Sequence, residues 1–248
     1  MIELRNVSKA FGTKQVLKNL SMQVNSGETL TIIGGSGSGK SVMIKHIIGL
    51  LKPDGGEIMI NGVDITKLKE KKLFETIQDF GLVFQGGALF DSLTVGENVA
   101  FGIKNKDKIP AGELNDRVDE CLERVGLPGI SQLMPAELSG GMKKRVAIAR
   151  AVAKKPRVIM YDEPTTGLDP IMADVINELI IKVNESPEIT SIVITHDMVS
   201  AYKISHRISM LYLGEIIETG TPDQIRNSTD PVVRQFIEGR SEGPIKLR

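Results

Sequence analysis

The 248-residue chain carries 31 basic and 31 acidic residues, so its formal net charge at pH 7 is zero. That balance argues against a partner bound mainly through counterion release, such as bare nucleic acid, and against a polybasic membrane anchor. A single cysteine, Cys121, excludes a disulfide framework and a four-cysteine zinc site within one chain, and we expect it to be a buried apolar residue.

Neither a signal peptide nor a membrane-spanning segment is predicted. The N-terminal stretch MIELRNVSKAF has no basic region followed by an apolar run. No window approaches the ~20 apolar residues that cross a bilayer as a helix. If the protein works at a membrane, we expect another chain to cross it.

Strand and helix patterns alternate along the chain, which favours an α/β fold. Strands are predicted at 2–7, 20–24, 29–33, 57–60, 80–83, 158–161, 191–195, 207–213 and 215–219. Helices are predicted at 40–49, 113–125, 140–154, 171–183 and 222–226. We therefore expect a mixed, mainly parallel sheet, an antiparallel β portion near the N-terminus and a helical insertion at about 86–155. The segment past Pro231 is punctuated by glycine and proline, and we expect an arm rather than a core element.

The stretch GGSGSGKS matches the phosphate-loop pattern G-x-x-x-x-G-K-[ST] between an apolar strand and a helix-compatible run. Its glycines let backbone N–H groups surround phosphate oxygens, and the helix N-terminus adds unpaired N–H groups and its dipole. Lys40 is predicted to reach the β- and γ-phosphates and the Ser41 hydroxyl to ligate Mg²⁺. The glycine spacing does not fit a dinucleotide-binding fingerprint. We predict a P-loop NTPase core whose nucleotide site includes Gly34, Gly35, Ser36, Gly37, Ser38, Gly39, Lys40, Ser41 and Val42.

The apolar strand VIMY is followed by two acids, Asp162 and Glu163. In a phosphate-loop protein a carboxylate at a strand end holds Mg²⁺, a role that we assign to Asp162. Glu163 is then expected to face the γ-phosphate and polarise the attacking water. In isolation such a pair would more often be a cap or an ion pair, and the phosphate loop favours the catalytic interpretation.

Three further residues extend the predicted site. His196 follows the strand SIVIT, where an imidazole can contact the γ-phosphate and the attacking water. Gln85 follows the strand FGLVF, where an amide can bind Mg²⁺ or position water. Phe11 offers an aromatic face for a base, although a core position is at least equally frequent for a phenylalanine. The remaining histidines, His46 and His206, are predicted to be structural.

These motifs, in this order, resemble the nucleotide-binding subunit of ABC transporters over essentially the whole chain. The resemblance assigns the A-loop to Phe11, Walker A to 34–41, the Q-loop to Gln85, the signature LSGGM to 138–142, Walker B to 158–163, the D-loop GLDP to 167–170 and the switch histidine to His196. It implies an ATPase domain at 1–230 that hydrolyses ATP with Mg²⁺. Met142 replaces the usual glutamine and Val42 a frequent threonine, and neither change removes a phosphate donor.

The resemblance also implies a head-to-tail dimer with a second copy of the chain. Walker A of one copy would face the signature of the other, so that Ser139, Gly140 and Gly141 contact the γ-phosphate in the partner's site. Asp169 of the D-loop would belong to the same nucleotide site. We expect the charges at 143–145 to form mostly a solvated face.

A narrower similarity concerns the segment FGLVFQGGALFDSLTVGENVAFGI at 80–103, the signature methionine and the tail VRQFIEGRSEGPI at 233–245. These resemble the ATPases of Mla-type, MCE-associated phospholipid transporters. The resemblance implies phospholipid transport between inner and outer membranes, with the ATPase peripheral at the cytoplasmic face of the inner membrane. It implies as partners an integral membrane permease near 86–103, an MCE-domain lipid-binding protein, a small STAS-domain regulatory subunit and, through the C-terminal extension 231–248, the partner protomer.

Two alternatives remain open at this point. Motif chemistry also suits the ATPase of another ABC importer, for example for amino acids, and a soluble ABC ATPase that assembles iron–sulfur clusters. The segment GALFDSLTV and the tail favour the phospholipid branch. A soluble ABC protein that acts on nucleic acid or a ribosome is disfavoured, because such proteins carry two ATPase domains, long coiled coils or cysteine zinc modules.

Overall fold

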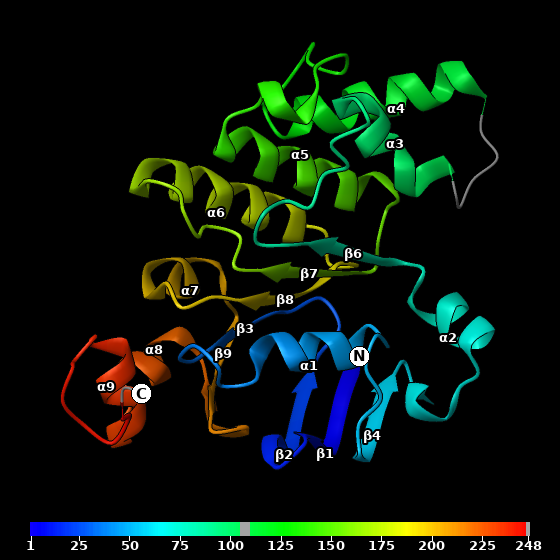
Figure 1. Cartoon of the computed structure of the whole chain (residues 1–248). Coiled ribbons are helices and arrows are strands. Elements are labelled where there is room, and N and C mark those ends of the chain that lie inside the picture. The colour runs from blue at the N-terminus through cyan, green and yellow to red at the C-terminus, as the bar shows by residue number, and fades with distance from the viewer. Residues whose placement is uncertain (105–109, 247–248) are drawn as a thin grey trace. The chain divides into compact units, whose positions relative to one another are not determined.

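The computed structural model describes residues 1–104 and 110–246, which form two compact units. The first unit comprises Met1–Gln78 and Ile192–Arg248, and the second comprises Asp79–Ser191. The strand β8 (Thr190–Ile194) contains the second boundary between them. Each unit has its own paired strands, helices and buried core (Figure 1).

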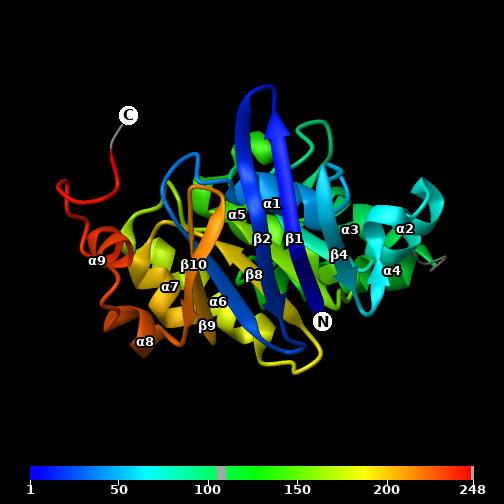
Figure 2. The same cartoon turned by 90° about the horizontal axis from the view of Figure 1, so that it is seen from below.

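An antiparallel sheet in the first unit confirms the predicted antiparallel portion. Its strand order is β2-β1-β4-β5, formed by β1 (Ile2–Phe11), β2 (Lys14–Val24), β4 (Gly55–Ile60) and β5 (Val63–Asp64). Figure 2 shows β2, β1 and β4 side by side. Ile2 and Leu4 are buried while the residue between them is only half-buried, as in a sheet with one face against a core.

A second group of strands in the first unit leads into the phosphate loop. β3 (Thr29–Ile33) pairs in parallel with β9 (Arg207–Tyr212), which pairs antiparallel with β10 (Glu215–Gly220). Every residue of β3 is buried, as expected for a parallel strand that is covered on both faces. The other elements between β3 and the end of this part of the chain are α1 (Lys40–Ile47), η1 (Ile65–Lys67) and α2 (Glu70–Ile77).

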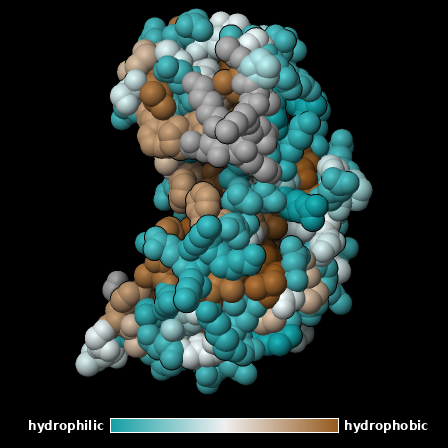
Figure 3. Space-filling view, turned by 90° about the vertical axis from the view of Figure 1, so that its right-hand side faces the viewer, coloured by the Kyte–Doolittle hydropathy of each residue, from teal (hydrophilic) through white to brown (hydrophobic). Residues whose placement is uncertain are grey.

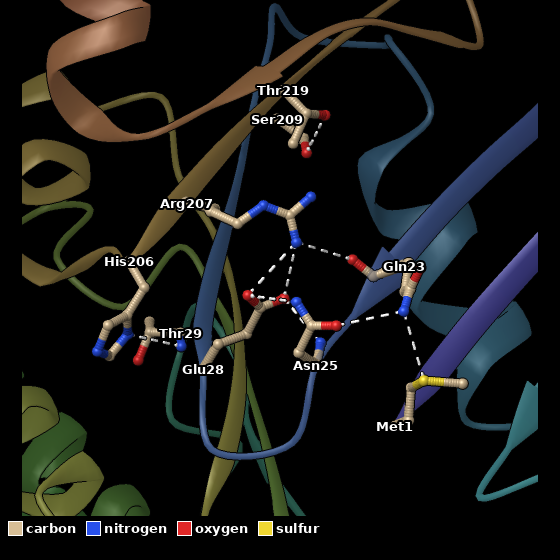
Figure 4. A network of polar contacts seen from close by, with 9 residues as sticks. All are labelled: Met1, Gln23, Asn25, Glu28, Thr29, His206, Arg207, Ser209 and Thr219. Carbon is tan, nitrogen blue, oxygen red and sulfur yellow. Dashed lines mark hydrogen bonds and ion pairs between the residues drawn. The ribbon is translucent and has the colours of Figure 1, made fainter.

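A network of hydrogen bonds and ion pairs links β9 to the connection between β2 and β3 (Figure 4). The Arg207 guanidinium donates to the Glu28 carboxylate at 3.1 and 3.3 Å and to the Gln23 carbonyl at 3.4 Å. The backbone N–H of Thr29 donates to Nδ1 of His206 at 2.9 Å. His206 therefore holds the start of β3 in place, which confirms its predicted structural role.

The second unit contains the predicted helical insertion. Its strands β6 (Phe80–Val83) and β7 (Val158–Asp162) are parallel. Its helices are α3 (Val95–Lys104), α4 (Ala111–Arg124), η2 (Pro135–Glu137), α5 (Gly140–Ala153) and α6 (Pro170–Asn184). Helices α3, α4 and α5 pack against one another, and Cys121 is buried, as predicted (Figure 1). Of the pairings described among these strands, β3 with β9 and β6 with β7 are parallel, and β9 with β10 is antiparallel. The prediction of mixed, mainly parallel strand pairing is therefore confirmed.

The C-terminal segment corrects one expectation. After α7 (Met198–Ile204) and α8 (Pro222–Arg226), the chain forms α9 (Pro231–Ile237), which is a core element and not an arm. Val233 is fully buried in a cluster with Ile208 and Met210. The Asp230 side chain caps the helix by accepting from the N–H groups of Val232 and Val233 at 2.8 and 3.1 Å. An aspartate before a proline is a helix-start signal, and the glycines farther on obscured it.

Residues beyond α9 fold against the helix. The Gln235 side chain accepts from the N–H of Ile245 at 2.7 Å and donates to the carbonyl of Arg240 at 3.2 Å. Gln235 is buried, and Ile245 packs against the same hydrophobic cluster. Across the described residues, no helix is both long and apolar enough to span a bilayer.

His46 of α1 is buried, which confirms the second histidine prediction. Nδ1 lies 2.7 Å from the Val42 carbonyl oxygen and so carries the proton of the neutral ring. Nε2 has no hydrogen-bond partner among the described residues. Burial lowers the pKa of His46, because protonation would place a charge in a poorly solvated position.

We predict that the folded state loses stability as the pH falls below about 6.5, the pKa of an unfolded-state histidine. In that range the unfolded chain binds a proton that folded His46 binds only at lower pH, so the stabilisation is complete above 6.5 and is lost below it. Melting temperatures between pH 5 and 8 should decline less steeply for His46→Leu than for the wild type. The exposed His196→Leu variant is the matched control, and equal slopes for His46→Leu and the wild type would contradict the assignment.

Candidate functional site

The phosphate loop of the first unit is pressed against two strands, and two of its glycines make that possible. Gly34 has a φ of 151°, and a Cβ there would lie 2.3 Å from the Leu211 carbonyl oxygen of β9. Gly39 has a φ of 112°, and a Cβ there would lie 3.0 Å from the Val16 carbonyl oxygen of β2. At Gly34 a Cβ would collide with the backbone of β9, and at Gly39 the positive φ and the close approach of β2 disfavour any side chain.

The phosphate loop encloses polar groups, and one of them, the buried Ser38 hydroxyl, has no hydrogen-bond partner among the described residues. Lys40 is 9% exposed, and its ammonium donates to the carbonyls of Gly34 and Gly35 at 2.6 and 3.0 Å. Helix α1 begins without a side-chain cap and without an acidic residue in its first turn. A cation, a helix N-terminus without a side-chain cap and an unpaired hydroxyl fit the phosphates of a nucleotide.

Four other predicted residues of the first unit, His196, Phe11, Ser41 and Val42, have distinct surroundings. The N–H of Thr195, at the end of β8, donates to the Ile32 carbonyl of β3 at 3.3 Å. The exposed His196 follows directly and so lies at the strand edge from which the phosphate loop leaves. Phe11 is 48% exposed at the end of β1, which excludes the alternative of a core phenylalanine. Ser41 is exposed and Val42 is half-buried.

The two acids of the second unit lie at the end of β7. Asp162 is the last residue of the strand and Glu163 follows it, both half-buried. Glu163 has a φ of 51°, in the left-handed region that costs a non-glycine residue roughly 1–2 kcal/mol. Its carboxylate accepts from the Thr166 hydroxyl at 2.9 Å, and its carbonyl accepts from the Thr166 N–H at 3.3 Å and the Lys144 ammonium at 3.4 Å.

The predicted magnesium ligands are all oxygen donors. Val83 of β6 pairs with Tyr161 of β7, so Gln85, two residues after β6, and Asp162, the last residue of β7, lie at the same edge of these parallel strands. A carboxylate, an amide oxygen and the Ser41 hydroxyl are ligands that Mg²⁺ accepts while it keeps several waters. The chemistry of the donor set therefore fits the ion. Within the described part of the chain, no group of three His, Cys, Asp or Glu side chains forms another metal site.

The signature segment forms the start of α5. Ser139 caps the helix, and its Oγ accepts from the Met142 N–H at 3.3 Å. Ser139 and Gly140 are exposed, so the N–H groups at this end can reach a ligand on another molecule. Gly141 is buried instead, and a Cβ there would lie 2.8 Å from the Met172 methyl group of α6. One glycine thus leaves the helix end open, and the next allows α5 and α6 to pack closely.

The expectation of a mostly solvated face at 143–145 is wrong, because none of the three residues is exposed and Lys143 is half-buried. Lys144 is only 6% exposed. Arg145 is half-buried and donates to the carbonyls of Val125 and Gly126 at 3.4 and 3.1 Å. Helix α5 contacts α3, α4, α6 and β6, so it has few solvated positions, and a stripe through Met142 does not define its only buried face.

Sequence reasoning also missed Arg150 of α5. Its guanidinium donates to the carbonyls of Gly87 and Ala88 at 2.8 and 2.7 Å. Both residues have positive φ, at 76° and 45°, so the cation holds the segment after Gln85 in an unusual conformation. The sequence does indicate this role, because Arg150 is the one charged residue among the apolar residues 146–153, and a charged side chain in such surroundings needs a polar partner.

A groove of about 400 Å³ lies beside this segment in the second unit. Three phenylalanines that line it, Phe84, Phe90 and Phe101, are 38–44% exposed. The rings of Phe90 and Phe101 are 4.6 Å apart at their centroids. Figure 3 shows hydrophobic residues exposed among hydrophilic ones on one face of the molecule. Exposed aromatic side chains gathered in a groove are typical of a surface that binds another protein.

Comparison with known proteins gives concordant results. The family described as ABC transporter matches residues 17–166. An intermembrane phospholipid transport system ATP-binding protein, MlaF of Haemophilus influenzae, is 41% identical over 248 residues, which is 100% of this chain and 94% of that protein. A probable ribonucleotide transport ATP-binding protein of Mycobacterium leprae is 38% identical over 246 residues, or 99% of this chain and 71% of that protein.

A solved structure shares the fold. It is the dimeric, post-hydrolysis state of an ATP-binding cassette bound to ADP and Pi. The TM-score is 0.82 at 35% sequence identity, and the match covers 90% of this chain and 99% of that one.

Asp169 has a structural role that can be tested separately from nucleotide binding. Its carboxylate caps α6 by accepting from the N–H groups of Ile171 and Met172 at 3.0 and 3.1 Å. We predict that Asp169→Ala lowers the free energy of unfolding by about 1 kcal/mol, because both bonds are lost. Asp169→Asn keeps the acceptor and should remain close to the wild type in chemical denaturation. Equal stability of the alanine variant and the wild type would refute the capping role.

Proposed function

The chain belongs to the ABC transporter family as an ATPase, and we propose that it drives the transport of phospholipids between two membranes. As in its family, ATP hydrolysis is coupled to transport. The observation that carries the proposal is the similarity to the intermembrane phospholipid transport protein, which extends over 100% of this chain and 94% of the relative. The mycobacterial relative named for ribonucleotides is matched over a smaller share of its length.

In the proposed reaction, water attacks the γ-phosphorus of ATP and the bond to the β,γ-bridging oxygen breaks, which releases ADP and phosphate. Lys40 and the N-terminal N–H groups of α1 hold the phosphates. Glu163 polarises the attacking water as general base, and His196 contacts the γ-phosphate. Bound through Ser41, Gln85 and Asp162, Mg²⁺ would supply charge neutralisation at the β- and γ-phosphates.

We infer that two copies of the chain close around two ATP molecules. The open N-terminus of α5, with Ser139, Gly140 and Gly141, would bind the γ-phosphate held by the other copy, with Asp169 nearby. The dimeric state of the ADP-bound relative supports this arrangement. ATP at 100 times its Kd stabilises a bound state by ~2.7 kcal/mol per site. Two sites approach the ~5.5 kcal/mol that shifts a two-state equilibrium from 1:99 to 99:1.

The partners follow from the exposed surfaces and the similarity together. We propose that the phenylalanine groove receives an integral membrane permease, which places the ATPase peripherally at the cytoplasmic face of the inner membrane. An MCE-domain lipid-binding protein and a small STAS-domain subunit are proposed as further members of the complex. The extension 231–248 is proposed to contact the partner protomer through its exposed residues beyond α9.

We predict that Glu163→Gln abolishes steady-state hydrolysis and traps an ATP-bound dimer, because the amide cannot accept the proton of the attacking water. Phosphate release and size-exclusion chromatography with ATP measure the two effects. Glu123→Gln, an exposed residue of α4, is the matched control and should hydrolyse ATP like the wild type. Normal turnover by Glu163→Gln would overturn the catalytic assignment.

The transported substrate is tested on the native complex. We predict that the chain, purified in mild detergent from its own cells, brings a permease and an MCE-domain protein with it, together with bound phospholipid. Mass spectrometry of the subunits and of extracted lipids measures this. A complex with a permease but with bound nucleotide-like cargo instead would favour the ribonucleotide alternative, and the absence of any membrane subunit would refute the transporter proposal.

A further inference from the structure

The turn at Glu163 is conformationally unusual for the residue that carries it. Glu163 directly follows β7 with a φ of 51°, a region that non-glycine residues occupy at a cost and that must be held by neighbours. The Thr166 N–H and hydroxyl bond to its carbonyl and carboxylate, respectively. These two bonds close the turn on its C-terminal side.

A buried cation supports the same turn from another element. Lys144, in the second turn of α5, is 6% exposed, and its ammonium donates to the Glu163 carbonyl at 3.4 Å. Lysine is almost never buried to this degree unless its charge has a partner. The geometry therefore joins the helix that starts with the signature to the backbone of the proposed general base.

The charges of the two residues also interact. Burial lowers the pKa of Lys144, and the negative charge of Glu163 acts in the opposite direction and favours the ammonium form. A neutral polar side chain would avoid the desolvation penalty of the cation. A buried lysine at this position therefore costs desolvation energy, which its hydrogen bond to the Glu163 carbonyl and its attraction to the Glu163 charge offset in part.

We propose that Lys144 is a positioning residue for Glu163: by holding the carbonyl of the left-handed turn, it keeps the Glu163 carboxylate in the orientation that activates water. The inference rests on the proposed catalytic role of Glu163. Small displacements of a catalytic group reduce turnover strongly, while nucleotide binding, which depends on the phosphate loop, is not affected. Lys144 itself touches neither substrate nor metal in this proposal.

The test compares kcat and KM for ATP in Lys144→Met, which keeps the length of the side chain and removes the donor. We expect kcat to fall on the order of 10- to 100-fold while KM for ATP changes less than about threefold, at an unchanged melting temperature. Lys144→Arg keeps a cationic donor and should recover most of the loss. Lys143→Met, one residue earlier on the same helix, is the matched control and should retain wild-type kcat.

The outcomes separate this inference from the proposed function. Glu163→Gln is assayed in parallel: if it is inactive while Lys144→Met turns over normally, the positioning role is refuted and the catalytic role stands. If Glu163→Gln is itself fully active, the proposed function fails first. If Lys144→Met does not fold, Lys144→Gln replaces it in the same comparison. A variant that loses ATP binding to the same extent as kcat would refute the inference and indicate a general structural role.

Discussion

The nucleotide site depends on the close contact between the phosphate loop and the backbones of β2 and β9. At Gly34 the loop approaches the Leu211 carbonyl oxygen so closely that a Cβ would displace β9, and at Gly39 it lies close to the backbone of β2. Within the loop, the Lys40 ammonium donates to the carbonyls of Gly34 and Gly35. The polar network around Arg207 and Glu28 secures β9 at its other end, so the support of the loop is distributed over the first unit.

The residues proposed to bind phosphate and metal could be selected from the sequence because that chemistry requires particular residue types at particular spacings. Lys40 begins α1 and Asp162 ends β7, as their motifs predict, and Gln85 lies in the turn two residues after β6. The mixed sheet and the helical insertion followed from periodicity in the same way. The left-handed backbone conformation of Glu163 could not be predicted, because a glutamate gives no indication in the sequence of a positive φ.

What sequence patterns missed depends on contacts between distant segments. Lys144 and Arg150 appear in the sequence as ordinary surface charges of a helix, yet they bind main-chain carbonyls that lie 19 and more than 60 residues away. Helix α9 was hidden by the glycines and prolines around it, although its burial depends on Val233 and on strands far earlier in the chain. Hydrophobic periodicity indicates which face of a helix or strand is apolar, but it does not indicate which other elements pack against that helix or strand.

The buried side chain of Gln235 gives the C-terminal residues a binding site on their own protomer. A segment tethered this closely competes with any external ligand at an effective concentration on the order of millimolar. A neighbouring protomer can therefore bind the C-terminal residues only if it binds them more tightly than their own protomer does. The equilibrium between the two positions of the tail would then depend on how the two copies are held together and on the length of chain left to span the gap.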